Sequence, residues 1–455
     1  MGGTHSNQHQ IDMTEGPILP KLLGFSIPLV LSGMMQLLFN AADVIVVGRF
    51  AGENSLAAVG ATGALINLMV NFFIGLSVGA NVVAAHFFGA GRRDQVEQTV
   101  HTAVLTSLCS GLVLTVAGIF GTGFILRFMQ VPPQVLGLAG LYLKVYFAGI
   151  TASMVYNFGS ALLRAKGDTR RPMFYLLYAG VLNVVLNLVF VIVLGMDVVG
   201  VALATVISQC VSAALVIWVL LGEEGEFRLD LRRLRIERDI LIGIVRVGVP
   251  AGFQGMVFSL SNVVIQSAVN GFGALVVAGS SAASNIEGFV YVAMNGFAQG
   301  ALTFSSQNLG AGRLDRVRRA LAVSFPAVLV AGVAVGGLVF LFRESLLGLY
   351  SDNPAVIAAG AIRISIICLL YAICGMMEVA ANTVRGLGHS LLPMMVSIAG
   401  VCGLRILWIA TVFQAPGLHT LEMLFYSYPV SWTVTLLAHL ACLFVILGRD
   451  RESVR

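Results

Sequence analysis

Three carboxylic acids lie inside long apolar stretches of this 455-residue chain. They are Asp43 in LLFNAADVIVVGRF, Glu287 in SNIEGFVY and Glu378 in GMMEVAAN. An ionised carboxylate at membrane depth costs about 2.5 to 3.5 kcal/mol or much more, so such residues indicate a functional site by default. A carboxylate that takes up a proton, a sodium ion or a cationic substrate can couple the movement of one to that of another. The alternative for Asp43 is a structural pair with a polar neighbour that holds helices together.

Polar side chains that could complete a site with such an acid occur in two further apolar stretches. Asn183 and Asn187 are four residues apart and therefore share one face of a helix, and Thr205 lies in the next stretch. Amide and hydroxyl oxygens are suitable ligands for a hard cation. Interhelical hydrogen bonding explains the same spacing equally well. No firm metal site follows, and the cation site that the sequence allows is sodium at Asp43, Asn183, Asn187 and Thr205.

The elements that must position these residues are membrane helices. The chain is 58% hydrophobic and only 11% charged, whereas an ordinary soluble domain has about 25% charged residues. Apolar runs of about 20 residues or more, long enough to cross a bilayer, recur along the chain. The sequence predicts an all-α polytopic membrane protein with twelve spans, at about 22–47, 55–87, 97–129, 136–163, 172–194, 198–221, 241–270, 274–308, 318–350, 354–384, 391–413 and 421–447.

Positive charge predicts the orientation of these spans. Most of the 27 Lys and Arg residues lie in alternate loops, at 89–95, 164–171, 228–239, 310–319 and 448–455. The positive-inside rule makes these loops cytoplasmic, which places both termini inside and the multi-pass chain in the cytoplasmic (inner) cell membrane. The net charge of +5 is then explained by the basic cytoplasmic loops. We expect no nucleic-acid partner, because the basic residues are spread over short loops.

An internal repeat divides the chain. GLSVGANVVAAHFFGAGRRDQV (75–96) aligns with GFAQGALTFSSQNLGAGRLDRV (296–317), and the same offset of 221 maps LLRAKGDTRRPM (162–173) onto TVRGLGHSLLPM (383–394). Two motifs in one register indicate a duplication. Because each half has an even number of spans, the halves form two parallel six-helix lobes with pseudo-two-fold symmetry. The predicted parts are an N-lobe, a cytoplasmic inter-lobe linker and a C-lobe, at 1–221, 222–240 and 241–455.

The repeat also provides a comparison for Asp43, which ends a polar stripe on one helix face. The spacing of the stripe is four, four and three residues, and its members are Ser32, Gln36, Asn40 and Asp43. The corresponding stripe of the second half has no acid and consists of Ser259, Asn262, Gln266 and Asn270. Amides and hydroxyls hold transmembrane helices together, which explains the second stripe but not an acid on one copy alone. We predict that proton or cation handling is biased toward the first lobe.

The repeat favours a transporter over an enzyme. Duplicated bundles enclose a path that opens to each side of the membrane in turn. An enzyme would need a nucleophile with its base, a metal cluster or a phosphate-binding loop, and we expect no HExxH, GxSxG or P-loop motif in this chain. The Gly-rich GAGR turns have no strand before them and indicate helix ends. We predict that the protein is not an enzyme and needs no cofactor besides a coupling proton or sodium ion.

The motifs QLLFNAADVIVVGRFAG, AAVGATG, GLSVGA, GAGRRD, LLRAKGD and VALATVIS resemble the prokaryotic MATE (multidrug and toxic compound extrusion) transporters. The resemblance covers nearly the whole chain, from about Ile18 to Ile446. It implies a V-shaped fold of twelve helices in two lobes, and export of amphipathic, often cationic compounds in exchange for protons or sodium ions. By the same resemblance Asp43 matches the coupling acid of the first helix, and the positions around it are matched by Asn183, Asn187 and Thr205.

The chain departs from the pattern of that family in two places. Members with a well-formed first-lobe cation site often carry a second acid in the fifth helix, like N-x-x-x-D, whereas NVVLN places Asn187 there. The site charge is lower by one, which favours protonation of a single carboxylate over sodium coordination. The seventh-helix stretch GMVFSLSN lacks the acid that some members have. Glu287 and Glu378 are candidates for substrate or ion contacts in that lobe, with a structural role as the alternative.

The sequence therefore predicts a cation-coupled antiporter, with protons favoured and sodium allowed, that exports amphipathic, often cationic drugs and toxic compounds by alternating access. We expect a monomer in the lipid bilayer whose cavity has adaptable apolar walls, with polar contacts from Gln36, Asn40, Asn262, Gln266, Glu287 and Glu378. One alternative is a flippase for a lipid-linked precursor, which would need a more cationic cavity than these spans offer. Another is a channel or receptor, which would not need a buried acid on one lobe.

Overall fold

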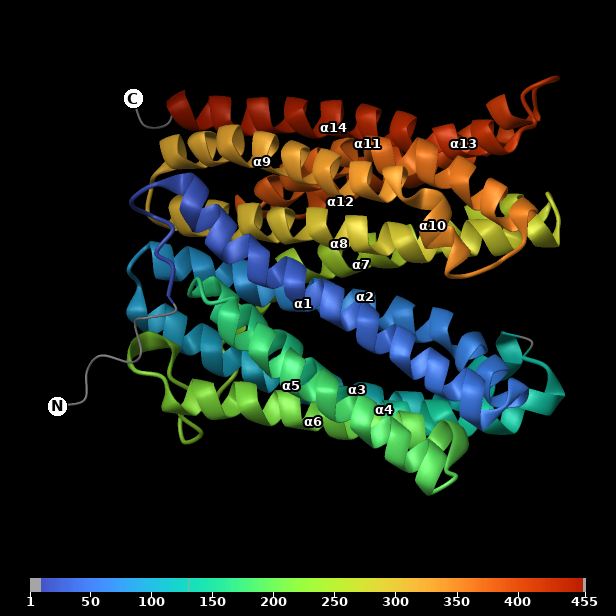
Figure 1. The fold of residues 1–455 in the computed structure, drawn as a ribbon. Helices are drawn as coiled ribbons and strands as arrows, with labels where there is room; N and C mark the ends of the chain where they lie inside the picture. Colours follow the sequence, from blue (N-terminus) through green and yellow to red (C-terminus); the bar gives the residue numbers. More distant parts are fainter. Residues whose placement is uncertain (1–9, 130, 453–455) are drawn as a thin grey trace. The chain divides into compact units, whose positions relative to one another are not determined.

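The computed structural model describes residues 10–129 and 131–452, which form helices joined by loops (Figure 1). In the labels used here, α marks an α-helix and η a π-helical or 3-10 turn. In chain order the elements are α1 (Ile18–Val46), η1 (Val47–Ala51), α2 (Glu53–Gly89), α3 (Arg93–Phe128), α4 (Pro133–Ala165), α5 (Arg170–Asn187), η2 (Leu188–Val193), α6 (Asp197–Gly222), η3 (Gly225–Phe227), α7 (Arg238–Asn270), α8 (Ala274–Gly310), α9 (Leu314–Leu341), α10 (Arg343–Gly348), α11 (Pro354–Gly386), α12 (Leu391–Ser397), η4 (Ile398–Gly403), α13 (Leu404–Ala410), η5 (Val412–Gln414) and α14 (Leu421–Glu452).

The predicted membrane class is confirmed. Twelve helical segments of the described residues are long and apolar enough to cross a membrane, and the mean hydropathy of their most apolar windows ranges from 1.2 to 2.5. The ends of the spans differ from the prediction by a few residues in most cases. The ninth was predicted too long, at 318–350: the helix ends at Leu341, because Arg343 and Glu344 begin the separate short helix α10.

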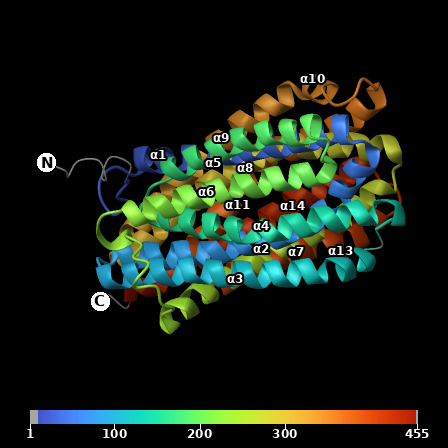
Figure 2. The ribbon, with the colours of Figure 1, turned by 90° about the horizontal axis from the view of Figure 1, so that it is seen from below.

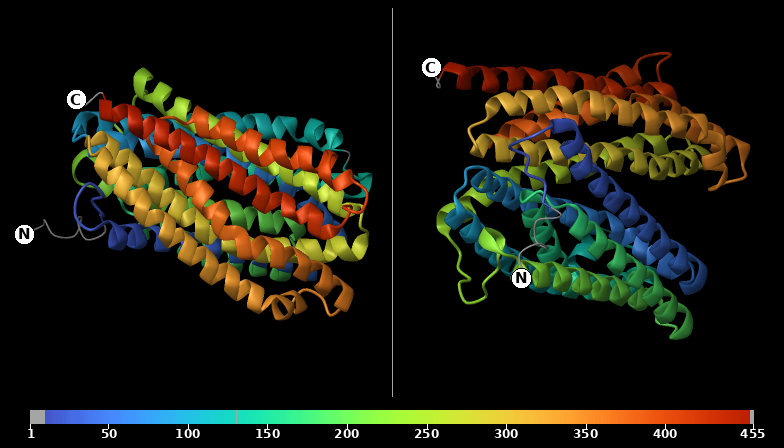
Figure 3. Two further views of the ribbon diagram at one scale, coloured as in Figure 1. Left: turned by 90° about the horizontal axis from the view of Figure 1, so that it is seen from above. Right: turned by 60° about the vertical axis from the view of Figure 1, so that its left-hand side comes forward.

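Contacts divide the chain into two compact units. The first unit contains Leu31–Gly248, whereas the second begins at Val249 and also includes Met13–Val30. Within the first unit α4 packs against α2, α3 and α6 (Figure 2). Within the second unit α11 packs against α8, α9 and α14 (Figure 3). The predicted lobes at 1–221 and 241–455, with their linker at 222–240, remain a prediction.

Each unit includes the first turns of a helix whose remainder belongs to the other unit, and glycines explain how those turns pack. The start of α7 lies so close to α2 that a Cβ atom at Gly79 would be 2.1 Å from the carbonyl oxygen of Ile244. The start of α1 also lies close to α8, where a Cβ at Gly300 would be 2.6 Å from the side-chain oxygen Oγ of Ser26. Gly79 and Gly300 are equivalent positions of the repeat. Small residues at these positions permit close backbone approach between membrane helices, so the repeated glycines mark these packing sites.

Candidate functional site

Four predicted site residues lie together in the first unit, on three helices. Asn187 of α5 donates from Nδ2 to the carboxylate of Asp43 on α1 and, at 3.3 Å, to Asn183 Oδ1. Asn183 donates from Nδ2 to Thr205 Oγ1 on α6 at 3.4 Å. The Thr205 hydroxyl donates to the carbonyl of Val201 at 3.0 Å. We call Asp43, Asn187, Asn183 and Thr205 the acid–amide network; what it does remains a prediction.

The acid–amide network has one polar atom without a partner. Asn187 is fully buried, Asn183 is buried, and Asp43 is half-buried. Both Nδ2 hydrogens of Asn187 are used, but its carbonyl oxygen Oδ1 accepts no hydrogen bond from the described residues. Leaving a buried acceptor unpaired costs about 1–3 kcal/mol. The site can therefore gain stability by presenting this oxygen to a protonated group or a cation.

Close packing of α1 on α5 holds the acid–amide network together. A Cβ atom at Gly180 would lie 1.8 Å from the ring of Phe39, so only glycine lets this ring lie against the backbone of α5. Gly180 is in the turn of α5 that precedes Asn183, and Phe39 is one turn before Asp43. The contact therefore sets the distance between the acid and the amides.

Both helices change their winding directly beyond the site. The π-helical turn η1 begins four residues after Asp43, and η2 begins at the residue after Asn187. Widened turns of this kind occur often at functional sites. They bring together an apolar cluster beside the acid–amide network, which comprises Val46, Val47, Val191 and Val201.

Tyr142 of α4 lies near Asp43, and it was not predicted from the sequence. Tyr142 is buried and interacts electrostatically with Asp43. Its ring stacks on that of Tyr146, with 6.4 Å between the centroids. The signal was available, because two hydroxyl-bearing residues four apart in an apolar span share a helix face.

The polar residues predicted to line a substrate cavity are on accessible helix faces. Gln36 and Asn40 of α1 are exposed in the first unit, and Asn262 of α7 is exposed in the second. Gln266 donates from Nε2 to Asn270 Oδ1 at 3.1 Å, a bond within α7, so the interhelical polar seam expected on this helix stays a prediction. A substrate-binding role for these residues remains a prediction.

Glu287 has a partner that the sequence analysis did not assign to it. Arg363 of α11 donates to both oxygens of Glu287 on α8, from Nε at 2.8 Å and from Nη2 at 2.9 Å. Both residues are buried, and Arg363 also donates from Nη1 to Ser280 Oγ at 2.8 Å. Because both carboxylate oxygens are used, this geometry favours the structural alternative for Glu287.

Glu378 begins a second chain of hydrogen bonds in the second unit. Asn382 donates from Nδ2 to the Glu378 carbonyl at 3.0 Å and to Oε2 at 3.4 Å. Arg385 donates to Asn382 Oδ1 and to Gln254 Oε1, both at 2.8 Å. An electrostatic attraction also links Arg385 to Glu378. Unlike Glu287, Glu378 has no arginine within salt-bridge distance in the described part of the chain, so its carboxylate is less constrained.

The expectation that the chain has no GxSxG motif is wrong by its letters, but the helix that carries the one such run explains it. GLSVG (75–79) has the letters of the hydrolase motif GxSxG, which requires a strand, a sharp turn and a helix. Here it lies within α2, and the Ser77 hydroxyl donates to the Ile74 carbonyl at 2.7 Å. The described residues contain no group of three or more His, Cys, Asp or Glu that could hold a metal ion.

The LLRAKGDTRR loop forms a buried charge cluster, whereas the sequence predicted only a basic cytoplasmic loop. Lys166 Nζ lies 2.6 Å from Glu223 Oε2, and Arg171 Nη1 lies 2.5 Å from Glu223 Oε1. Asp168 is fully buried, pairs with Arg171 and accepts from the backbone N–H of Arg170 at 3.1 Å. These bonds tie the end of α4 to the start of α5 and the end of α6.

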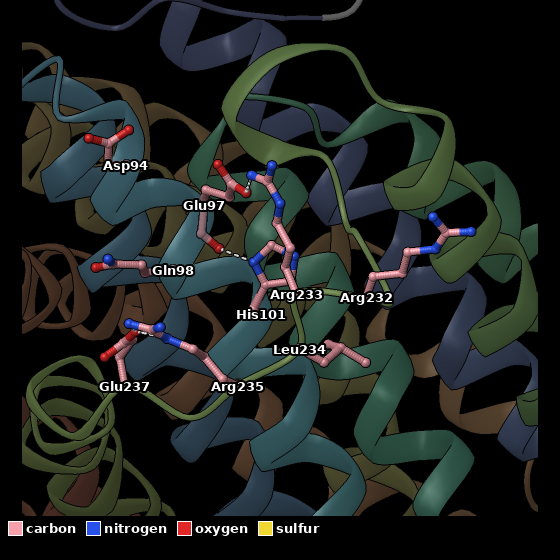
Figure 4. Close-up of a pocket in the computed structure, with 9 residues that line it drawn as sticks. All are labelled: Asp94, Glu97, Gln98, His101, Arg232, Arg233, Leu234, Arg235 and Glu237. Atoms are coloured by element: carbon pink, nitrogen blue, oxygen red, sulfur yellow. Dashed lines mark hydrogen bonds and ion pairs between the residues drawn. The ribbon is translucent and has the colours of Figure 1, made fainter.

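A surface pocket of about 470 Å³ lies between α3 and the connection that precedes α7 (Figure 4). His101 joins its two walls: Nδ1 donates to the Glu97 carbonyl at 2.8 Å, and Nε2 accepts from the Asp230 backbone N–H at 3.0 Å. Arg233 pairs with Glu97 at 3.0 Å and Arg235 pairs with Glu237. The charges of the pocket are directed mainly at one another, which indicates anchoring of the connection.

Comparisons with known proteins agree with this architecture. A family model described as MatE matches residues 28–189 and 250–410. The Bacillus subtilis "Probable multidrug resistance protein YoeA" is 27% identical, with 91% of this chain and 90% of that protein covered. The Thermotoga maritima "Probable multidrug resistance protein NorM" is 26% identical, with 86% and 84% covered.

A solved structure described as a crystal structure of MATE in complex with MaL6 has the same fold. It superimposes with a TM-score of 0.91 at 22% sequence identity, covering 97% of this chain and 98% of that one. The two matched segments of the family model fall in the two halves of the internal repeat and together include more than two thirds of the chain. The chain therefore belongs to the MatE family, a family of membrane transporters rather than enzymes.

Proposed function

We propose that this protein is a proton-coupled antiporter that exports amphipathic, often cationic compounds, and that Asp43 carries the coupling proton. The observation behind the proposal is the hydrogen-bond chain from Asp43 through Asn187 and Asn183 to Thr205. It links three helices through one titratable group. A change in the charge of Asp43 therefore changes the bonds that α1, α5 and α6 make with one another.

The unpaired carbonyl oxygen of Asn187 allows the acid–amide network a second hydrogen-bonding arrangement when Asp43 is protonated. When Asp43 is ionised, it accepts from Asn187 Nδ2, as in the structure. When Asp43 is protonated, it carries an O–H donor, and an amide turned by half a rotation offers Oδ1 as the acceptor. The turned amide also withdraws its Nδ2 from Asn183, so the donors and acceptors along the chain to Thr205 rearrange. Protonation thus favours a different packing of the three helices.

Sodium is the second candidate for the coupling ion. Asp43, Asn183, Asn187 and Thr205 offer hard oxygen ligands, but only one of these residues carries a charge. Neutralising one carboxylate requires one proton and no further ligands. This comparison favours the proton.

The substrate class rests on the relatives and on the accessible face of α1. YoeA and NorM are described as probable multidrug resistance proteins. The accessible polar residues Gln36 and Asn40 alternate along α1 with the partly exposed Met34, Met35 and Phe39. Flexible methionine and aromatic walls tolerate ligands of varied shape. We place the protein in the cytoplasmic membrane as a monomer, with both termini inside.

Reconstituted proteoliposomes test the coupling. Efflux of a fluorescent cation is measured under an imposed pH gradient and, separately, under a sodium gradient, for wild type and Asp43→Asn. We expect efflux driven by the pH gradient in wild type and its loss in Asp43→Asn. Glu344→Gln, which removes an exposed carboxylate of α10, is the matched control and should behave as wild type. Undiminished gradient-driven efflux in Asp43→Asn contradicts the assignment, and efflux that neither gradient drives favours the flippase.

A further inference from the structure

Arg405 carries a positive charge in the middle of a membrane span without an acidic partner. It lies in α13, at the fifteenth position of the 24-residue span Leu391–Gln414, and only 4% of its surface is exposed. No carboxylate lies within 4 Å of its guanidinium in the described part of the chain. Such a residue is expensive in a membrane and is expected to have a partner.

Among the described residues, hydrogen bonds satisfy only one of the five N–H donors of Arg405. Its Nε donates to Ser431 Oγ on α14 at 3.0 Å, across helices that lie side by side (Figure 1). Its guanidinium carbon lies 4.0 Å from the ring centroid of Tyr428 and 5.8 Å from that of Trp432. Aromatic faces attract the charge but accept none of the four N–H groups of Nη1 and Nη2. The terminal nitrogens need an acceptor from elsewhere.

The nearest buried ion pair of the second unit offers Arg405 no partner. The ring of Tyr428 also faces Arg363, whose guanidinium carbon is 5.9 Å from its centroid. Arg363 uses both oxygens of Glu287, so that carboxylate has no free oxygen for Arg405. Two arginines therefore lie near one tyrosine ring, and the Glu287 carboxylate pairs with Arg363.

We propose that Arg405 is an anion-binding residue of the second unit, which receives a carboxylate group or a halide ion on Nη1 and Nη2. A planar guanidinium presents two parallel N–H groups, which match a carboxylate bidentately. The carboxylate would come from a zwitterionic or anionic amphipathic substrate, and the halide from solution. Both neutralise the charge that Glu287 leaves uncompensated. This inference does not depend on the coupling role of Asp43.

The test uses the fluorescence of Trp432, whose ring faces Arg405. The full-length chain is purified in detergent with Trp218 and Trp408 replaced by Phe, so that Trp432 is the remaining tryptophan of the sequence, and it is titrated with iodide at constant ionic strength. Iodide quenches tryptophan on contact. We expect a saturable component of quenching, which chloride or octanoate displaces, and we expect Arg405→Gln to abolish it. Arg343→Gln removes an arginine that is paired with Glu344 at 3.8 Å and should leave the saturable component unchanged.

Arg405→Lys separates the two sources of the anion and keeps the test valid if Arg405→Gln does not fold. Lysine retains the charge but not the bidentate fork, so displacement by octanoate should weaken on the order of tenfold while halide binding changes less. Displacement at lower concentration by octanoate than by chloride identifies a substrate carboxylate, and the reverse order identifies a halide. Linear quenching in wild type overturns the proposal. So does saturable quenching that persists in folded Arg405→Gln, or that chloride and octanoate displace from Arg405→Lys as they do from wild type.

Discussion

Asn187 donates its amide N–H to Asp43, although the two residues are 144 positions apart in the chain. The bond joins the first and fifth membrane spans. It also places an amide where a second carboxylate would create a doubly charged site. The choice between amide and acid at this position therefore sets the charge that a coupling ion has to neutralise.

Asn187→Asp should move the coupling preference toward sodium. The substitution raises the site charge from −1 to −2, and ligand charge is a main determinant of cation affinity. We expect sodium-driven efflux to appear at about tenfold lower sodium concentration, equivalent to about 1.4 kcal/mol. Gln134→Glu, which adds an acid at an exposed position at the start of α4, is the control for added charge. Equal sodium dependence in Asn187→Asp and wild type would show that residue 187 does not control ion choice.

Gly180→Ala should destabilise the first unit. The added methyl group would lie 1.8 Å from the Phe39 ring, and overpacking of this kind costs about 1–3 kcal/mol. Thermal unfolding of the purified protein in detergent measures the effect. Gly337→Ala in α9, where a Cβ would meet nothing within 4 Å, should be neutral or stabilising by up to about 1 kcal/mol. If the two variants unfold at the same temperature, the contact between Gly180 and Phe39 does not determine the stability of the first unit.

Glu287→Gln should destabilise the second unit more than the loss of both charges does. Removing one partner of a buried ion pair costs about 3–5 kcal/mol, whereas replacing both with apolar groups is often neutral. Thermal unfolding of Glu287→Gln, Arg363→Met and the double variant Glu287→Met/Arg363→Met forms the comparison. We expect the double variant to be more stable than either single one. If instead all three remain stable and only transport is lost, Glu287 acts on substrate or ion as the sequence first suggested.

His101→Phe should loosen the connection between the halves. The imidazole joins the Glu97 carbonyl to the Asp230 N–H. Losing about 1 kcal/mol of hydrogen bonding raises the fraction of molecules in which this connection is detached by about fivefold. Trypsin cleavage within RLDLRRLRIERD should accelerate by a similar factor. Gln98→Ala, in the wall of the same pocket, should cleave at the wild-type rate. Equal rates for both variants would mean that other contacts hold this segment.

The twelve spans could be predicted from local signals, whereas the grouping of Asn183, Asn187 and Thr205 around Asp43 was implied by the family resemblance. Each span is a continuous apolar run, and Asn183 and Asn187 share a helix face by spacing alone. The pairing of Glu287 with Arg363 could not be predicted, because 76 residues separate them. The periodicity of one helix does not show which residues of another helix its side chains contact. The spacing of Tyr142 and Tyr146 indicates a shared helix face, but only the packing of α4 shows that Tyr142 lies near Asp43.

The close contacts at Gly79 and Gly300 have a consequence for how the chain is assembled. When α2 has been synthesised, the segment that covers Gly79 is the start of α7, more than 140 residues later in the sequence. The first repeat therefore cannot finish its own interior before translation has passed the connection, and a chain cut there would leave both pieces incomplete. Two unfused copies of such a repeat would complete each other by trading helix ends, as in a domain-swapped dimer.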